Sequence, residues 1–95
     1  MDREYLLKLC LGYDAKLAGW CGGFGAKKVD LTSNHHSLMD SLRHVRWMLA
    51  EMLRMDPENT AKLNRWLGFV QGVLFTAGIY TVDELRRHVI QGAVE

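Results

Sequence analysis

Apolar residues along this chain recur at intervals of four and three, a spacing that places their side chains on one face of an α-helix. Three series follow this rule. They comprise Leu6, Cys10, Tyr13, Leu17 and Trp20; Leu38, Leu42, Val45, Leu49 and Met52; and Leu63, Leu67, Val70, Leu74 and Ala77. The first series predicts a helix over about residues 3–19. Because glycines such as Gly12 and Gly19 each weaken a helix by up to about 1 kcal/mol, a short strand over 5–11 is the alternative there.

Capping residues indicate where the helices begin and end. Asp2 precedes the first helix, and the run Thr32–Asn34 offers three good caps for the second. The run Asp56–Glu58 predicts a tight turn, with Asp as the cap of the third helix and Pro at its first position. Gly78 suits the left-handed residue that follows a helix, and the run Thr81–Glu84 has the sequence of a capping box.

These boundaries predict an all-α fold, a small helical bundle in one domain over residues 1–95. An N-terminal helix (1–20) and a Gly-rich loop (21–33) precede an antiparallel helical hairpin (34–78), whose helices cover about 34–55 and 57–78. Residues 81–91 form a short C-terminal helix. The predicted hairpin core contains Leu42, Leu49, Leu67 and Val70. In the C-terminal helix, we expect the core-facing side to contain Val82, Leu85 and Val89. We expect the solvent-facing side to contain Arg86, Arg87 and His88.

The helix over 62–78 carries a second face that is small or apolar rather than charged, so we expect this helix to be central. This face contains Arg65, Gly68, Phe69, Gly72 and Phe75. Either the first helix of the same chain packs there, or a second copy does, which would make the face an oligomer interface. Arg65 then needs an acid such as Asp14 or Glu84, or an anion.

Composition narrows the function classes. The chain has 95 residues, 48% of them hydrophobic, with one proline, which is typical of a globular domain. A net charge of +1 gives no bulk attraction to nucleic acid or to an anionic membrane. Two cysteines make no disulfide framework, and no signal peptide or membrane-spanning run is present, so a cytoplasmic location is expected.

Trp47 is the most unusual residue of the second helix, because it lies opposite the apolar stripe among charged neighbours. Arg43, Glu51 and Arg54 share its face. One interpretation is that another part of the chain, such as the first helix, covers the indole. The other is that Arg43, Trp47, Glu51 and Arg54 bind a partner protein, since Trp and Arg are favoured anchors of interfaces.

The Gly-rich loop offers a second candidate site, because Lys27 and Lys28 follow three glycines. Glycine amides and ammonium groups bind phosphates. The loop matches neither phosphate-binding motif of nucleotide-binding proteins, however, so a flexible linker with two solvated lysines is favoured. Lys27, Lys28 and Arg65 remain the candidate anion-binding set for a nucleotide or nucleic acid.

The sequence contains no clear metal-binding or catalytic motif. His36, Asp40 and His44 would share one helix face, but surface ion pairing is favoured over metal binding. Cys10 belongs to an apolar stripe and is expected in the core. No nucleophile, base and orienting group can be named together. We therefore predict no enzyme, no metal and no cofactor.

The C-terminal half contains a distinctive block. The run RWLGFVQGVL (65–74) is followed by Gly78-Ile79-Tyr80-Thr81-Val82-Asp83-Glu84-Leu85-Arg86. This block resembles one found in small bacteriophage and prophage proteins, and the resemblance covers about the last sixty residues. It implies a viral accessory protein of the host cytoplasm that binds and inhibits a host protein, including host-defence proteins. Sequestering a nucleotide signal is the alternative that the resemblance implies.

Overall fold

The computed structural model of the chain describes residues 1–32 and 36–94. In this part of the chain it shows four helices and no strand, which confirms the predicted all-α helical bundle. The helices are α1 (Arg3–Cys21), α2 (Leu38–Arg54), α3 (Thr60–Thr76) and α4 (Val82–Gln91). The alternative of a strand over 5–11 is wrong, because Gly12 and Gly19 both lie inside α1.

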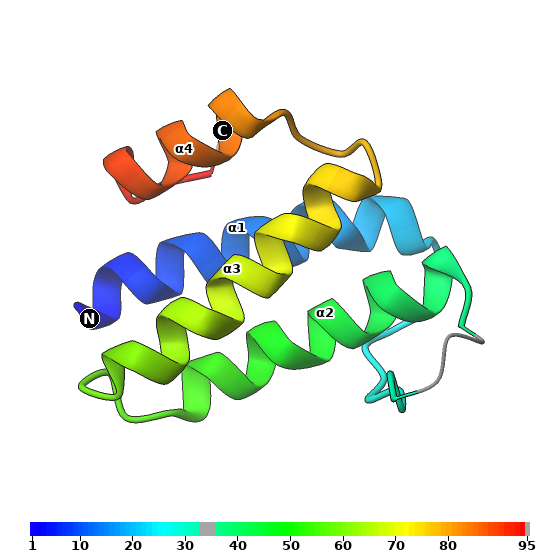
Figure 1. Cartoon of the computed structure of the whole chain (residues 1–95), viewed down its shortest axis with the longest axis horizontal. Coiled ribbons are helices and arrows are strands. Elements are labelled where there is room, and N and C mark those ends of the chain that lie inside the picture. Colours follow the sequence, from blue (N-terminus) through cyan, green and yellow to red (C-terminus); the bar gives the residue numbers. More distant parts are fainter. Residues whose placement is uncertain (33–35, 95) are drawn as a thin grey trace.

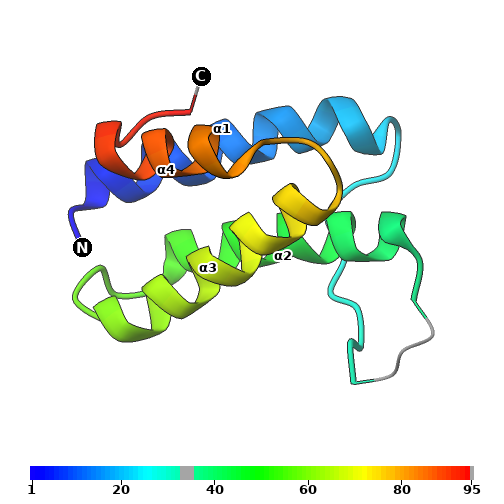
Figure 2. The same cartoon turned by 45° about the horizontal axis from the view of Figure 1, so that its top comes forward.

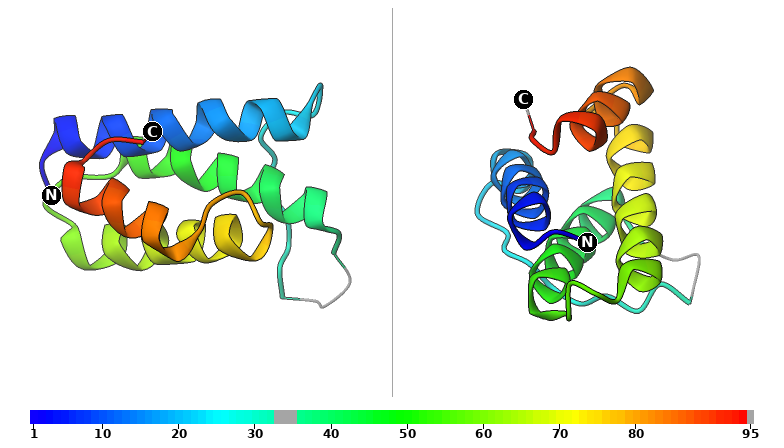
Figure 3. Two further views of the ribbon diagram at one scale, coloured as in Figure 1. Left: turned by 90° about the horizontal axis from the view of Figure 1, so that it is seen from above. Right: turned by 90° about the vertical axis from the view of Figure 1, so that its left-hand side faces the viewer.

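The helices α2 and α3 form the predicted antiparallel hairpin, and α1 packs along it (Figure 1). Viewed along the bundle, α4 bridges α1 and α3 on the side away from α2 (Figure 3, right). The expectation that α3 is central is wrong. The central element is α2, which packs against both α1 and α3, whereas α3 lies at one edge of the bundle.

The core lies where α1, α2 and α3 meet. Leu42, Leu49, Leu67 and Val70 are all buried there, as predicted. Cys10 and Cys21 are also buried, and both are free thiols. Two residues of the predicted apolar series do not join this core. They are Leu38, the first of the second series, and Trp20, the last of the first series, and both lie exposed at helix ends.

Helix α2 begins later than predicted, and none of the three expected caps begins it. Ser37 is the cap: its hydroxyl accepts the Asp40 N–H at 3.1 Å, and the Asp40 carboxylate accepts the Ser37 N–H at 3.2 Å. These reciprocal bonds satisfy two backbone donors at once, which explains why the helix begins here. Thr32 lies before the helix, and the expected caps Ser33 and Asn34 lie outside the described residues.

The turn between α2 and α3 is longer than predicted. The Asp56 carboxylate accepts the Glu58 N–H at 3.0 Å, and the Asp56 carbonyl accepts the Asn59 N–H at 2.9 Å. These bonds close a turn that contains Pro57, so α3 begins at Thr60 and not at Pro57. At the other end, Gly78 has the predicted left-handed backbone, with φ of 75°.

Helix α4 presents a different face from the predicted one. Thr81 and Glu84 form the expected capping box. Leu85 is buried as predicted, but Val82 and Val89 are exposed. His88, which was expected to point outward, is the second buried residue of this helix. The orientation of α4 follows from two polar contacts, one between His88 and Tyr13 of α1 and one from Gln71 of α3 to the Leu85 carbonyl.

The C-terminal segment lies alongside α1 (Figure 2), and two glycines permit close contacts between them. A Cβ atom on Gly12 would lie 2.6 Å from the Cβ of Val94. Gly92 has a φ of 68° and lies against the ring of Tyr5, whose hydroxyl donates to the Val89 carbonyl at 2.9 Å. Larger residues at either glycine would push the C-terminal segment away from α1.

Candidate binding surfaces

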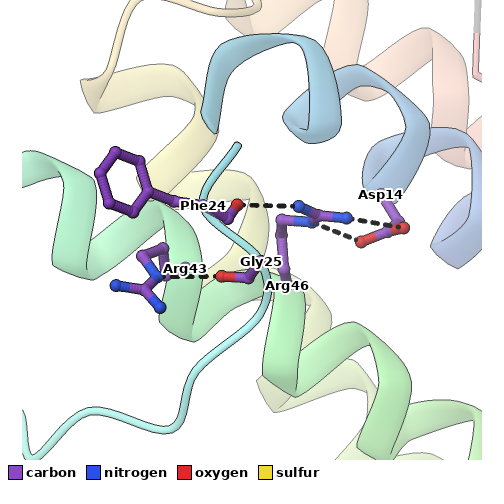
Figure 4. Close-up of polar contacts among 5 residues, drawn as sticks. All are labelled: Asp14, Phe24, Gly25, Arg43 and Arg46. Atoms are coloured by element: carbon purple, nitrogen blue, oxygen red, sulfur yellow. Dashed lines mark hydrogen bonds and ion pairs between the residues drawn. The ribbon is translucent and has the colours of Figure 1, made fainter. Parts of the chain in front are cut away.

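The Gly-rich loop is fixed to the bundle by two arginines of α2 (Figure 4). Arg43 donates through Nε to the Gly25 carbonyl at 2.9 Å, and Arg46 donates to the Phe24 carbonyl at 3.3 Å. Arg46 also forms an ion pair with Asp14 of α1, at 2.9 Å. The guanidinium groups therefore join the loop, α1 and α2.

Backbone contacts continue this attachment along the loop. The Lys27 N–H donates to the Arg43 carbonyl at 3.1 Å, and the Val29 N–H donates to Nδ1 of His44 at 3.0 Å. The prediction of a flexible linker is therefore wrong for residues 24–29, which the α2 helix holds in place. Both lysines remain exposed, as expected.

His44 accepts a hydrogen bond through Nδ1, so its neutral ring carries the proton on Nε2. Burial and the neighbouring Lys28 ammonium lower the pKa of His44 below its usual value. Both effects favour the neutral ring, which is the form that accepts from Val29. The attachment of the loop is therefore strongest above the usual titration range of histidine.

Trp47 packs against residues that were not expected to cover it. Its ring lies 6.0 Å from that of Trp66 on α3 and 5.3 Å from that of His44, measured between centroids. The Lys28 Nζ lies 5.2 Å from the Trp47 centroid, and the Lys62 Nζ lies 5.3 Å from that of Trp66. We call Lys28, Trp47, Trp66 and Lys62 the indole strip. Both indoles are half-buried, so Trp47 is covered in part by α3 and the loop, not by α1.

Trp66 was not predicted as a neighbour of Trp47, although the predicted hairpin places the two residues side by side. In an antiparallel pair, residues equally distant from the turn lie side by side. Trp47 and Trp66 are symmetric about the Asp56–Pro57 bond. Trp66 also lies four residues after Lys62, the spacing that brings two side chains together on a helix.

The four residues predicted to bind a partner are not one free surface. Arg43 holds the loop, with its guanidinium also 5.4 Å from the Phe24 ring centroid. Glu51 and Arg54 pair with each other at 3.3 Å. Arg54 is exposed and Trp47 presents only part of its ring, so the available surface is shifted toward α3.

The second face of α3 is open, and the first helix does not cover it. Among the exposed large apolar side chains, Phe69 is 45%, Phe75 51%, Leu38 55% and Val82 49% accessible. Apart from the adjacent residues and the helix's own backbone, no atom lies within 4 Å of a Cβ built on Gly72 or on Gly68. Two open grooves of about 310 Å³ each run along either side of Gly72. We call this surface the Gly72 face.

Arg65 does not pair with either expected acid. Asp14 binds Arg46, and the Glu84 carboxylate accepts the Thr81 N–H at 2.9 Å. Arg65 is exposed and makes no hydrogen bond or ion pair with any described residue. The groove that Lys28 lines does not include Arg65. The predicted anion-binding set is divided between α3, which carries Arg65, and the loop, which carries Lys27 and Lys28.

A buried polar cluster joins three helices, and the sequence did not indicate it. Gln71 of α3 donates to the Tyr13 hydroxyl at 3.0 Å and to the Leu85 carbonyl at 3.4 Å. The Tyr13 hydroxyl lies 3.0 Å from Nδ1 of His88, and the Tyr80 ring meets His88 edge-on at 4.8 Å. Burial raises the pKa of Tyr13 to about 12. This cluster orients α4 and serves a structural role.

Metal binding by His36, Asp40 and His44 finds no geometric support. His36 precedes α2, so the three residues do not share a helix face, and Asp40 is used in the cap. Within residues 1–32 and 36–94, no group of three metal-ligating side chains comes together.

Comparison with known proteins identifies no relative. No protein-family model matches the chain, and neither a curated protein nor a solved structure matches it. Among the described helices, none is both long and apolar enough to cross a membrane.

Proposed function

We propose that this chain is a small accessory protein, of the bacteriophage type that its C-terminal block resembles, which binds and inhibits a host protein through the indole strip. The observation that supports this most is the pair of part-exposed indoles between two lysines. The role is one of binding rather than catalysis, and the expected location is the host cytoplasm.

The chemistry of the strip defines its partner. Two adjacent indoles offer a large, rigid apolar area at little cost in conformational entropy, a property of residues that dominate binding energy. Lys28 and Lys62 add positive charge at both ends of this area. A complementary partner segment has an apolar side chain between acidic ones, because opposite charges align the two surfaces as they meet.

A nucleotide or a single-stranded nucleic acid is the second candidate, since bases stack on aromatic rings and lysines contact phosphates. One observation favours it: a groove of about 620 Å³ adjoins the strip and is lined by Lys28, His44 and Asp30 among others. The carboxylate of Asp30 counts against it. Hydrogen bonds from Thr32 lower the pKa of Asp30, which keeps a negative charge in the groove where a phosphate would bind.

The proposal is tested by capture of host proteins on immobilised chain, followed by affinity measurement with the captured partner. Lys28→Glu/Lys62→Glu should abolish capture, because both ends of the strip become repulsive to an acidic segment. Lys8→Glu/Lys16→Glu on α1 is the matched control with the same net charge. If both double variants lose capture equally, or if neither loses it, the strip does not bind the partner.

Tryptophan emission separates the two candidates. In a Trp20→Phe variant, the tryptophan emission comes from Trp47 and Trp66 alone. Titration with a dT oligonucleotide should leave this emission unchanged if the partner is a protein. Quenching that weakens steeply with added salt would favour the nucleic acid instead, since phosphate contacts release counterions.

A further inference from the structure

We propose that the Gly72 face binds a second copy of this chain, with the two α3 helices crossing antiparallel at Gly72. The inference is independent of the indole strip. It begins from the exposed apolar side chains of this face, which monomeric proteins seldom leave together in water.

The order of residues around Gly72 makes the face complementary to itself. Phe69 and Phe75 lie three residues before and after Gly72, and the small residues Gly68 and Thr76 lie four before and after it. On a helix, an offset of three residues corresponds to about 60° around the axis and about 4.5 Å along it. The two rings therefore occupy opposite corners of a rectangle centred on Gly72, and the other two corners are open.

A two-fold axis at Gly72 fills the open corners. If the axis lies in the interface and perpendicular to α3, the rings of the second copy fall on the corners that the first copy leaves open. These corners correspond to the grooves on either side of Gly72, one lined by Leu38 and Val73 and the other by Val82 and Leu85. The absence of a Cβ at Gly72 lets the two backbones approach at the crossing point.

The charge on Arg65 selects the antiparallel arrangement. Arg65 lies seven residues before Gly72, so a parallel pair would bring the two guanidinium groups together. An antiparallel pair instead places Arg65 near the C-terminal end of the partner's α3. The last turn of α3 contains no basic residue of its own, and helix C-termini carry partial negative charge that attracts cations. Arg65 makes no ion pair among the described residues, so it is available for this contact.

The exposed area is near the lower limit for a specific interface. Each half-exposed phenyl ring contributes about 100 Å², half of what a fully buried aromatic ring covers. With Leu38, Val82 and the polar rim, each copy approaches the roughly 500 Å² that half of a minimal interface of about 1,000 Å² requires. We therefore expect a reversible dimer that dissociates in the micromolar range.

Sedimentation of the full chain from 1 to 200 μM, with Gly72→Leu and Gly19→Leu compared, tests the inference. Wild type and Gly19→Leu should reach the mass of a dimer, while Gly72→Leu stays monomeric. Both glycines are exposed inside helices, and a Cβ built on either would meet no atom within 4 Å beyond the adjacent residues and the helix's own backbone, so the substitutions are matched. The helical signal of Gly72→Leu should be retained, because Leu favours the helix over Gly. Should Gly72→Leu not fold, Phe75→Ser, which removes an exposed ring, must lower dimer affinity at least tenfold.

A spin label at Asn64→Cys, an exposed position of α3 that leaves the Arg65 charge in place, tests the orientation. The antiparallel pair places the two labelled positions about 24 Å apart along α3, since each lies eight residues from the crossing point at about 1.5 Å per residue. A wild-type monomer at 200 μM, a dimer that Gly72→Leu does not weaken, or a label separation that indicates a parallel pair would each overturn the inference as stated.

Discussion

Removal of the Tyr13 hydroxyl should destabilise the protein far more than removal of the Tyr5 hydroxyl. Both hydroxyls reach α4 from α1, but their surroundings differ. Tyr13 is fully buried and its oxygen contacts Gln71 and His88, each at 3.0 Å. The Tyr5 hydroxyl makes one bond, to the Val89 carbonyl, at a position open to water.

The magnitude follows from what each substitution leaves behind. Tyr13→Phe keeps the ring but removes the hydroxyl that contacts the buried His88 and the half-buried Gln71. Removal of a buried hydrogen-bond partner costs about 1–3 kcal/mol. In Tyr5→Phe, water replaces the hydroxyl at the Val89 carbonyl, so the expected cost is at most about 1 kcal/mol. For a domain of this size, each kcal/mol corresponds to about 4–8 °C in Tm.

Urea unfolding followed by circular dichroism measures both costs, with the two variants at equal concentration so that self-association affects them alike. Comparable losses in the two variants would refute the reasoning, since the expected difference rests on the burial of the Tyr13 hydroxyl and on its second contact. A Tyr13→Phe variant as stable as the wild type would show that the polar cluster does not hold α4 in place.

Three further predictions address the core and the ionisable groups. Leu49→Ala should lower the free energy of unfolding by about 2–5 kcal/mol in urea, and a loss below 1 kcal/mol would contradict its place in the core. The pKa of His44 is lower in the folded chain, so stability should fall as pH drops below about 6.5, and in His44→Phe this dependence should be weaker. Burial raises the pKa of Cys10 from 9.0 to about 12, so its thiol ionises first in the unfolded chain. The free energy of unfolding should therefore fall as pH rises from 9 to 12, and the Cys10→Ala variant should lose less of its stability over that interval.

The helices and the hairpin core could be predicted because periodicity depends on local spacing. The four-and-three series identified α1, α2 and α3 and most of their buried residues. The boundaries were harder, because several neighbouring residues can cap a helix. Ser37 caps α2 because the Asp40 carboxylate also accepts a hydrogen bond from the Ser37 N–H. Asp56 closes a turn instead of capping α3.

The binding surfaces depended on contacts between distant residues, which periodicity does not reveal. Whether Trp47 is covered depends on Trp66 and on a loop whose attachment requires Arg43 and Arg46. The face of α4 depends on the buried partners of His88, so the apolar positions Val82 and Val89 misled the prediction. The open face of α3 was identified correctly as small and apolar, but the sequence did not show that α1 leaves it uncovered.

The contacts between α1 and α4 also affect when the chain can fold. Tyr13 and His88 are 75 residues apart, and Tyr5 and Val89 are 84 apart. At a synthesis rate of about 5–20 residues per second, several seconds separate the completion of α1 from that of α4. The hairpin, whose contacts are local, can form during this interval. The side of α1 that α4 covers stays exposed until α4 is made, so this part of the bundle folds late and more slowly than bundles built from neighbouring helices.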